Sequence, residues 1–232
     1  MAIIKLLHGS DHVIEKPNLN IAKPTNDYGR GFYCTDIPEM AKEWACKKNV
    51  DGIVNEYYFD FDGLNILNLL DGNYNVLNWI AILLNNRIFT INSPIALKSK
   101  NYIIDNFSID ISKYDVVIGY RADDSYFSYA QSFIHNELPL KSLGKALMLG
   151  NLGKQIVLVS DKAINNLHFC NSSYVDKNIY YPKFLNRDTK ARLIYNKEIK
   201  NSDDFLNDLF VMDIMREEIK NDDERIQRII FK

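Results

Sequence analysis

The stretch Gly29-Arg30-Gly31-Phe32-Tyr33-Cys34-Thr35 fixes the organisation of the first half of the chain. Its aromatic and apolar residues favour a β-strand, and the glycines just before them allow the backbone to approach a neighbouring segment closely. A polar stretch, residues 11–30, precedes this strand and contains prolines and asparagines, so we expect a long loop there. Long ordered loops in compact domains are often functional, which directs attention to the region beside this strand.

The alternation and apolar runs of the remaining sequence predict strands interspersed with helices. The run AIIKLL at residues 2–7 predicts a buried strand that ends at His8-Gly9-Ser10. Further strands are predicted at 53–61, 64–70, 114–120 and 155–159, and helices after Pro38 and at 76–87, 95–104, 125–135, 140–149, 162–167, 190–200 and 203–219. Residues 170–186 show no clear period. This pattern indicates the α+β class, with one domain over residues 1–170 and a helical C-terminal extension over residues 171–232.

Composition bounds the function. The 232 residues include 28 Lys and Arg against 30 Asp and Glu. This near balance of charge argues against non-specific electrostatic binding of nucleic acid or anionic lipid over the whole surface. Three cysteines do not form a disulfide framework and indicate a reducing compartment. No apolar run is long enough to span a membrane, and the N-terminus lacks the features of a secretion signal. We therefore expect a cytoplasmic protein without a membrane partner.

Three motifs occur in a telling order: His8-Gly9-Ser10, the run from Asp27 to Thr35, and Gln155 at the start of a late strand. Together they resemble the ADP-ribosyltransferase superfamily, in the branch that diphtheria toxin shares with the poly(ADP-ribose) polymerases. They are also similar to a family of small bacterial proteins assigned to that superfamily. The resemblance covers residues 3–170. It implies a split mixed β-sheet with flanking helices, and NAD bound as a substrate in the cleft between the two halves of the sheet.

The resemblance also implies roles for individual residues. His8 would bind a ribose hydroxyl of NAD, Gly9 and Ser10 would hold the nicotinamide carboxamide, and Tyr33 would stack on the nicotinamide ring. The full set of residues expected to contact NAD is His8, Gly9, Ser10, Arg30, Gly31, Tyr33 and Thr35. Such groups act by positioning the reactants and by stabilising charge in the transition state.

The third motif departs from the superfamily because Gln155 stands where its better-known enzymes carry Glu. A carboxylate about 5 Å from the developing positive charge contributes on the order of 3 kcal/mol at an effective dielectric near 20, which is about a hundredfold in rate. Asp123 and Asp124 follow the strand at 114–120 and are candidates to supply that charge. The expected catalytic residues are therefore His8, Tyr33, Gln155 and Asp124.

Each of these residues also has a purely structural interpretation. His8 would be a turn histidine, Tyr33 a core residue, and Gln155 a polar residue that opens a buried strand. Asp124 would cap a helix. Arg30 and Arg87 could meet the NAD pyrophosphate through bidentate contacts, whereas in the structural interpretation Arg87 would be exposed to solvent or would form a structural ion pair. Cys34 would be a small buried thiol and not a nucleophile.

The resemblance predicts an intracellular bacterial mono-ADP-ribosyltransferase that transfers ADP-ribose to a protein or nucleic-acid acceptor and releases nicotinamide. Enzymes of this kind are often toxins of toxin–antitoxin or phage-defence pairs, which implies an inhibitor protein as a partner. The alternatives are a non-catalytic module that binds NAD or ADP-ribose, and an NAD glycohydrolase. An RNA 2′-phosphotransferase is less favoured because residues 1–29 contain no Arg. No metal is expected, since the spacing of His168 and Cys170 relative to the other cysteines does not match a zinc site.

Overall fold

A computed structural model describes residues 3–122, 124–149, 153–199 and 204–227. The strands are β1 (Ile4–Ser10), β2 (Phe32–Cys34), β3 (Gly52–Phe59), β4 (Ile66–Asn68), β5 (Val116–Tyr120), β6 (Lys154–Leu158) and β7 (Leu167–Val175). The helices are α1 (Pro38–Ala45), α2 (Val76–Asn86), α3 (Pro94–Phe107), α4 (Asp124–Ile134), α5 (Leu140–Leu147), α6 (Asp161–Asn165), α7 (Lys177–Ile194), α8 (Asp204–Asn207), α9 (Val211–Arg216) and α10 (Glu224–Gln227). The expected α+β class is confirmed.

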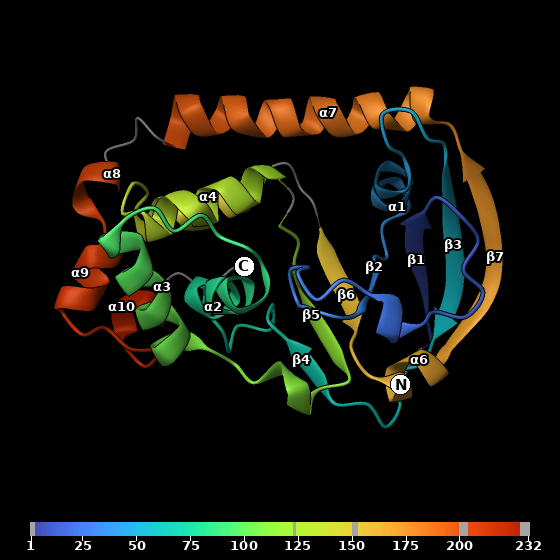
Figure 1. The fold of residues 1–232 in the computed structure, drawn as a ribbon, viewed down its shortest axis with the longest axis horizontal. Helices are drawn as coiled ribbons and strands as arrows, with labels where there is room; N and C mark the ends of the chain where they lie inside the picture. The colour runs from blue at the N-terminus through green and yellow to red at the C-terminus, as the bar shows by residue number, and fades with distance from the viewer. Residues whose placement is uncertain (1–2, 123, 150–152, 200–203, 228–232) are drawn as a thin grey trace.

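The strands form two sheets that meet at one point (Figure 1). The first sheet has the order β1-β3-β7 and is antiparallel throughout. The second has the order β2-β6-β5-β4 and is mixed, because β4 and β5 run parallel. Leu7 and Thr35 join the two sheets through reciprocal backbone hydrogen bonds of 2.9 Å. The ends of β1 and β2 are therefore held side by side, and the loop between these two strands crosses the junction.

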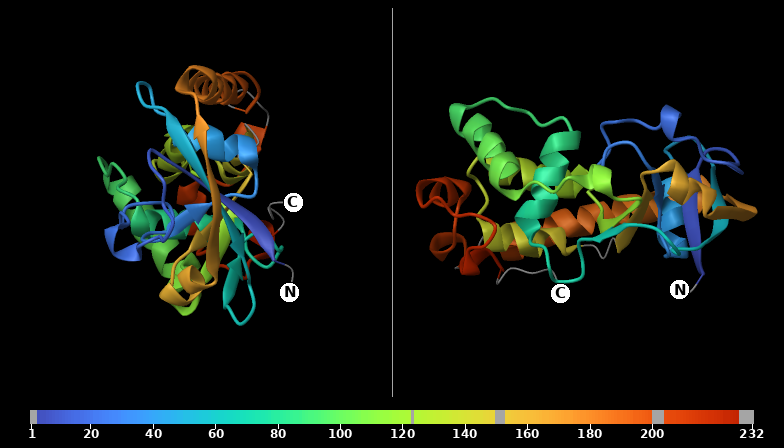
Figure 2. Two further views of the ribbon diagram at one scale, coloured as in Figure 1. Left: turned by 90° about the vertical axis from the view of Figure 1, so that its right-hand side faces the viewer. Right: turned by 90° about the horizontal axis from the view of Figure 1, so that it is seen from below.

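The helices lie mainly beside the second sheet (Figures 1 and 2). The helix α2 begins with a capping box, in which the Asn75 side chain accepts the backbone N–H of Asn78 and Asn78 returns a bond to the backbone of Asn75. Every residue of α2 from Val76 to Leu84 is buried. This helix is the centre of the largest hydrophobic cluster, to which Ile199, Val211, Ile214, Ile219 and Ile226 of the C-terminal region also belong.

Two smaller clusters support the first sheet. One lies between the sheets and includes Leu6, Phe32, Tyr57 and Ile156. The other packs α1 against β1 and β3 through Leu7, Ala41, Ala45, Cys46, Val54 and Val175. Gly9 is required in this contact because a Cβ there would lie 2.3 Å from the Ala41 carbonyl oxygen.

The C-terminal region differs most from the expected elements. The strand β7 pairs with β3 from Leu167 to Val175, and residue 170, the expected domain boundary, falls inside it at a shift of the register. The helix α7 begins at Lys177, well before the predicted residue 190, and runs past α1 and α4 (Figure 1). The single helix predicted at 203–219 is wrong. The chain breaks into α8 and α9 because Asp208 and the Leu209 carbonyl accept the first free backbone N–H groups of α5.

Candidate functional site

A cavity of about 600 Å³ lies where the two sheets meet. Its walls come from the ends of β1 and β2, from the loop between them, from Trp44 of α1, and from residues 87, 121–122 and 155. This volume is typical of sites for small molecules and cofactors. The loop supplies an apolar wall, including Val13 and Ile21, whose side chains are exposed in the protein.

His8 stands on this cavity at the end of β1. Its ring is stacked on Phe32 with centroids 4.3 Å apart, and its Nδ1 lies 2.7 Å from the Tyr33 carbonyl oxygen. A carbonyl only accepts, so Nδ1 carries the proton of the neutral ring and Nε2 is left as an acceptor. Burial lowers the pKa of His8, and the Tyr33 carbonyl opposes this only in part. The neutral ring is therefore suited to accept a hydrogen bond from a hydroxyl.

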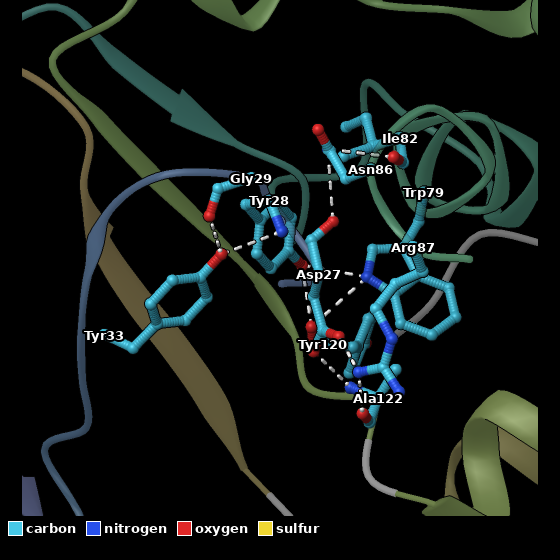
Figure 3. A network of polar contacts seen from close by, with 10 residues as sticks. All are labelled: Asp27, Tyr28, Gly29, Tyr33, Trp79, Ile82, Asn86, Arg87, Tyr120 and Ala122. Atoms are coloured by element: carbon cyan, nitrogen blue, oxygen red, sulfur yellow. Dashed lines mark hydrogen bonds and ion pairs between the residues drawn. The ribbon is translucent and has the colours of Figure 1, made fainter. Parts of the chain in front are cut away.

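Tyr33 lies next to it, with its ring in the cavity wall. Its hydroxyl donates to the Gly29 carbonyl at 2.7 Å and accepts the Tyr28 backbone N–H at 3.0 Å (Figure 3). Burial raises the pKa of this hydroxyl, so it stays neutral. Because both functions of the hydroxyl are used, the residue offers a ligand only its aromatic ring, held in a fixed orientation.

Gln155 enters the cavity wall from β6. It is 5% exposed, and its Oε1 is buried without a hydrogen-bond partner among the residues that the structure describes. Its register partner on the neighbouring strand β5 is Gly119. The Tyr28 hydroxyl occupies the place that a side chain at residue 119 would take. A buried amide oxygen without a partner is costly in a folded protein. Gln155 also lines the cavity, but this oxygen is itself covered by protein atoms, so a ligand would reach it only after the amide turns toward the cavity.

A buried carboxylate, Asp27, anchors the far end of the loop (Figure 3). Its Oδ1 lies 2.7 Å from Nη1 of Arg87, and its Oδ2 accepts the Ala122 backbone N–H at 2.9 Å. Burial raises the pKa of Asp27, while the Ala122 N–H and Arg87 oppose the shift. Of the two structural interpretations of Arg87, the ion pair is the one observed, and this pair also lies in the cavity wall.

The hydrogen bonds continue from Asp27 to the core (Figure 3). Tyr28 donates its hydroxyl to the Tyr120 carbonyl at 2.7 Å and accepts Nε1–H of Trp79 at 2.8 Å. Asn86 donates to the Asp27 carbonyl at 3.3 Å. Residues 27–29, which hold the Tyr33 hydroxyl, are thus fixed to α2 and β5.

An aromatic–cation pair forms another part of the wall. The guanidinium of Arg121 lies over the Trp44 ring, with its carbon 3.9 Å from the ring centroid. Trp44 Nε1 is buried and has no hydrogen-bond partner in the described part of the chain. The cation is thus held over the face of the indole ring, and both residues line the cavity.

The structure brings together some of the predicted site residues and not others. The cavity is lined by His8, Gly9, Gly31, Tyr33 and Gln155. Ser10, Arg30 and Thr35 are not part of its wall. Ser10 receives Nδ2–H of Asn55, Arg30 is exposed and donates to the Asn20 carbonyl, and Thr35 is fully buried with its hydroxyl accepting the Ile37 backbone N–H.

The two acidic candidates after β5, Asp123 and Asp124, cannot be placed relative to the cavity. The backbone of Asp124 opens α4, but its side chain lies outside the described residues, as does all of Asp123. The thiol of Cys34 is completely buried, and burial raises its pKa, which opposes a nucleophilic role. The described residues contain no group of three His, Cys, Asp or Glu placed to share a metal ion.

Sequence reasoning missed several residues of the wall. Trp44 and Arg121 are far apart in sequence, and Asp27 entered the motif without a role of its own. The usable signal was the loop at residues 11–30, which was expected to be functional and which contains Glu15 and Lys16 of the wall.

Fold and cavity define an α+β protein whose ligand-sized cavity lies at the junction of two small sheets. Residues 4–169 match the model of a family described as a protein of unknown function, DUF3990, and the chain belongs to this family. All residues of the cavity wall lie inside the matched range. Neither the curated proteins nor the solved structures include a match to the chain. In the part of the chain that the structure describes, no helix has the length and apolar composition needed to cross a bilayer.

Proposed function

We propose that this protein binds NAD in the cavity between the two sheets and transfers its ADP-ribose group to an acceptor, with release of nicotinamide. One observation carries the proposal. His8, Tyr33 and Gln155 come from three strands and are far apart in sequence, yet all three line the same cavity. A shared structural role does not require this convergence, whereas binding of one ligand does.

The roles follow from the chemistry of each group. The acceptor nitrogen of the neutral His8 ring suits a ribose hydroxyl. The fixed ring of Tyr33 suits a flat nicotinamide, and the backbone of Gly9, which lines the cavity, suits the carboxamide. The amide of Gln155 suits the ribose 2′-hydroxyl, for which its unpaired oxygen would be an acceptor once the amide turns toward the cavity. Arg121, which lies over the Trp44 ring in the cavity wall, provides positive charge for a diphosphate.

Two other activities at the same site compete with this proposal, and Gln155 is the reason. An amide offers no negative charge to the ribose cation, so the protein would bind NAD without cleaving it if nothing else supplied that charge. Water could also replace the acceptor, which would make the protein an NAD glycohydrolase. That reaction needs a group that activates water, and the amide of Gln155 is a poor base.

Incubation with NAD labelled in its adenylate phosphate, together with a bacterial lysate, tests the proposal. We expect label on protein or nucleic acid with the wild type, and its loss in His8→Ala and Tyr33→Ala. His168→Ala and Tyr58→Ala are matched controls, because both residues are exposed and lie outside the cavity wall. Protease or nuclease sensitivity of the label identifies the class of acceptor.

The remaining outcomes separate the competing activities. Free ADP-ribose without labelled acceptor indicates the glycohydrolase. Calorimetric binding of NAD without cleavage indicates the binding module. If NAD is neither bound nor consumed, the proposal is wrong.

A further inference from the structure

The proposed reaction requires a negative charge that Gln155 does not provide. The bond between ribose C1′ and the nicotinamide nitrogen breaks, and its electron pair stays with nicotinamide, which leaves as a neutral molecule. The ribose is left with a positive charge shared between C1′ and the ring oxygen. A carboxylate at this point would stabilise that charge and would also take the proton that the acceptor loses.

Only two carboxylates line the cavity among the residues that the structure describes, Glu15 and Asp27. Asp27 is occupied, since one oxygen lies 2.7 Å from Arg87 and the other accepts the Ala122 backbone N–H at 2.9 Å. Its charge is offset by the guanidinium and is used to hold the loop. Asp27 therefore supplies little net negative charge to a ligand.

Glu15 is different in each of these respects. Its side chain is exposed, and within the described ranges it makes no hydrogen bond or ion pair. A carboxylate without a protein partner among the described residues, in the wall of a cavity that also contains Lys16, Arg87 and Arg121, is available to a ligand. Binding of NAD would displace water around it and would strengthen its interaction with a nearby positive charge.

The backbone on the N-terminal side of Glu15 is fixed to the strand that carries the proposed ribose ligand. Asn55 is fully buried and is the register partner of His8. Its side chain accepts the Ile14 backbone N–H at 2.9 Å and donates to the His12 carbonyl at 3.2 Å. The hydroxyl of Tyr57 donates to the Ile14 carbonyl. The residue immediately before Glu15 is thus held against β3, beside the end of β1.

The C-terminal side of Glu15 is also restricted. Pro17 is buried in the cavity wall, its ring fixes its own φ, and it disfavours helical geometry at the residue before it. Glu15 consequently lies in a short segment with both ends fixed. The position of its Cα is set by the fold, even though the side chain is exposed.

We propose that Glu15 is the catalytic carboxylate of this site. It lies in the loop between β1 and β2 and supplies the negative charge that Gln155 of β6 does not provide. It stabilises the ribose cation as nicotinamide leaves, and it accepts the acceptor's proton as the new bond to C1′ forms. This inference rests on the proposed function.

The test is the rate of nicotinamide release from NAD by wild type, Glu15→Gln and Glu15→Asp. We expect Glu15→Gln to lower the rate at least about tenfold while the dissociation constant for NAD changes less than about twofold. Glu15→Asp should retain a measurable part of the rate. Glu39→Gln is the matched control, because Glu39 is an exposed glutamate of α1 that pairs with Lys42 and Lys183 outside the cavity.

A double variant adds a test that loss of folding cannot imitate. Adding Gln155→Glu to Glu15→Gln returns a carboxylate to the cavity from β6 and should recover at least about tenfold in rate. If the wild type releases nicotinamide and Glu15→Gln is equally fast, the assignment of Glu15 is wrong while the proposed function stands. If the wild type neither binds nor cleaves NAD, the proposed function fails and the assignment fails with it.

Discussion

The two halves of the molecule are stabilised in different ways. The four-stranded sheet is covered by α2–α5 and by the C-terminal helices, and a single large apolar cluster fills the space between them (Figure 1). The three-stranded sheet has only small clusters, and its buried residues include the polar Asn55. The half that contains the four-stranded sheet, called the large half below, is stabilised by apolar burial. The half that contains the three-stranded sheet, called the small half below, holds the loop between β1 and β2 at the junction through hydrogen bonds.

The cavity takes residues from both halves, and they have different characters. The large half supplies Arg87, Arg121 and Gln155, which are attached to well-packed elements. The small half supplies His8 and Glu15, whose positions depend on β1 and on the loop after it. Stability and binding should therefore respond differently to substitution in the two halves.

The largest expected effect compares one substitution in the two halves. Leu77→Ala in α2 and Leu7→Ala in β1 both remove a side chain that is at most 3% exposed. Leu77 lies in the large cluster, where surrounding helices limit collapse around the space left behind, so we expect a loss of about 5 kcal/mol. Leu7 lies in the small cluster with α1, and we expect about 3 kcal/mol. Chemical denaturation of both variants measures the difference, and equal losses would contradict the contrast between the halves.

The next effect concerns the anchor of the loop on the large half. Asp27→Asn removes the charge that pairs with Arg87 and weakens the bond from Ala122. We expect a loss of about 2 kcal/mol, less than for a fully buried pair because the Arg87 side chain is 24% exposed. NAD affinity should fall as well, since residues 27–29 hold the Tyr33 hydroxyl. Denaturation and calorimetry on the same variant measure both quantities. Unchanged NAD affinity would show that the ion pair of Asp27 and Arg87 does not position the binding site.

The anchor on the small half should separate binding and catalysis from stability more clearly. Asn55→Ala leaves the Ile14 backbone N–H and the His12 carbonyl without their partner, which water can partly replace because the loop is near the surface. We expect a loss of about 1 kcal/mol in stability and a larger proportional loss in nicotinamide release, because the position of Glu15 is no longer fixed. Thermal melting and the release assay give the two values. A stability loss with full activity would contradict the role of this anchor.

The smallest effect is the pH dependence contributed by His8. Burial lowers the pKa of His8 below the ordinary 6.5, so the unfolded chain takes up a proton more readily than the folded protein. The contribution of His8 to stability is therefore lost as the pH falls through 6.5 toward the lower value of the folded state. His8→Gln should lose less stability between pH 8 and pH 5 than the wild type does. A larger loss in the variant would have the wrong sign.

The sequence was sufficient for elements with a strong apolar pattern. The helix at 76–87 and the strands at 53–61, 114–120 and 155–159 appear within two residues of their predicted bounds, because one or both faces of each are buried. The strand β7 was missed because it is the edge strand of a thin sheet and alternates only weakly. The helix α7 was missed in part because only Ala191 is buried along it and Pro182 interrupts its sequence.

The site shows the same division. The motif residues His8, Gly9, Gly31, Tyr33 and Gln155 were found by their order in the chain, and the structure brings them to one cavity. The partners of Asp27, Arg87 and Ala122, lie 60 and 95 residues away from it in sequence, so no local sequence pattern predicts these contacts. The sequence neighbours Ser10, Arg30 and Thr35 have side chains turned to other tasks, which only the three-dimensional arrangement reveals.

We propose that NAD occupies the junction of the two sheets, and a crystal structure of the protein with NAD would show whether it does. We expect NAD in the cavity, with the nicotinamide ring against Tyr33 and a ribose hydroxyl within hydrogen-bond distance of His8 Nε2. A crystal saturated with NAD in which this cavity holds only water, or in which NAD lies on another surface, would contradict it.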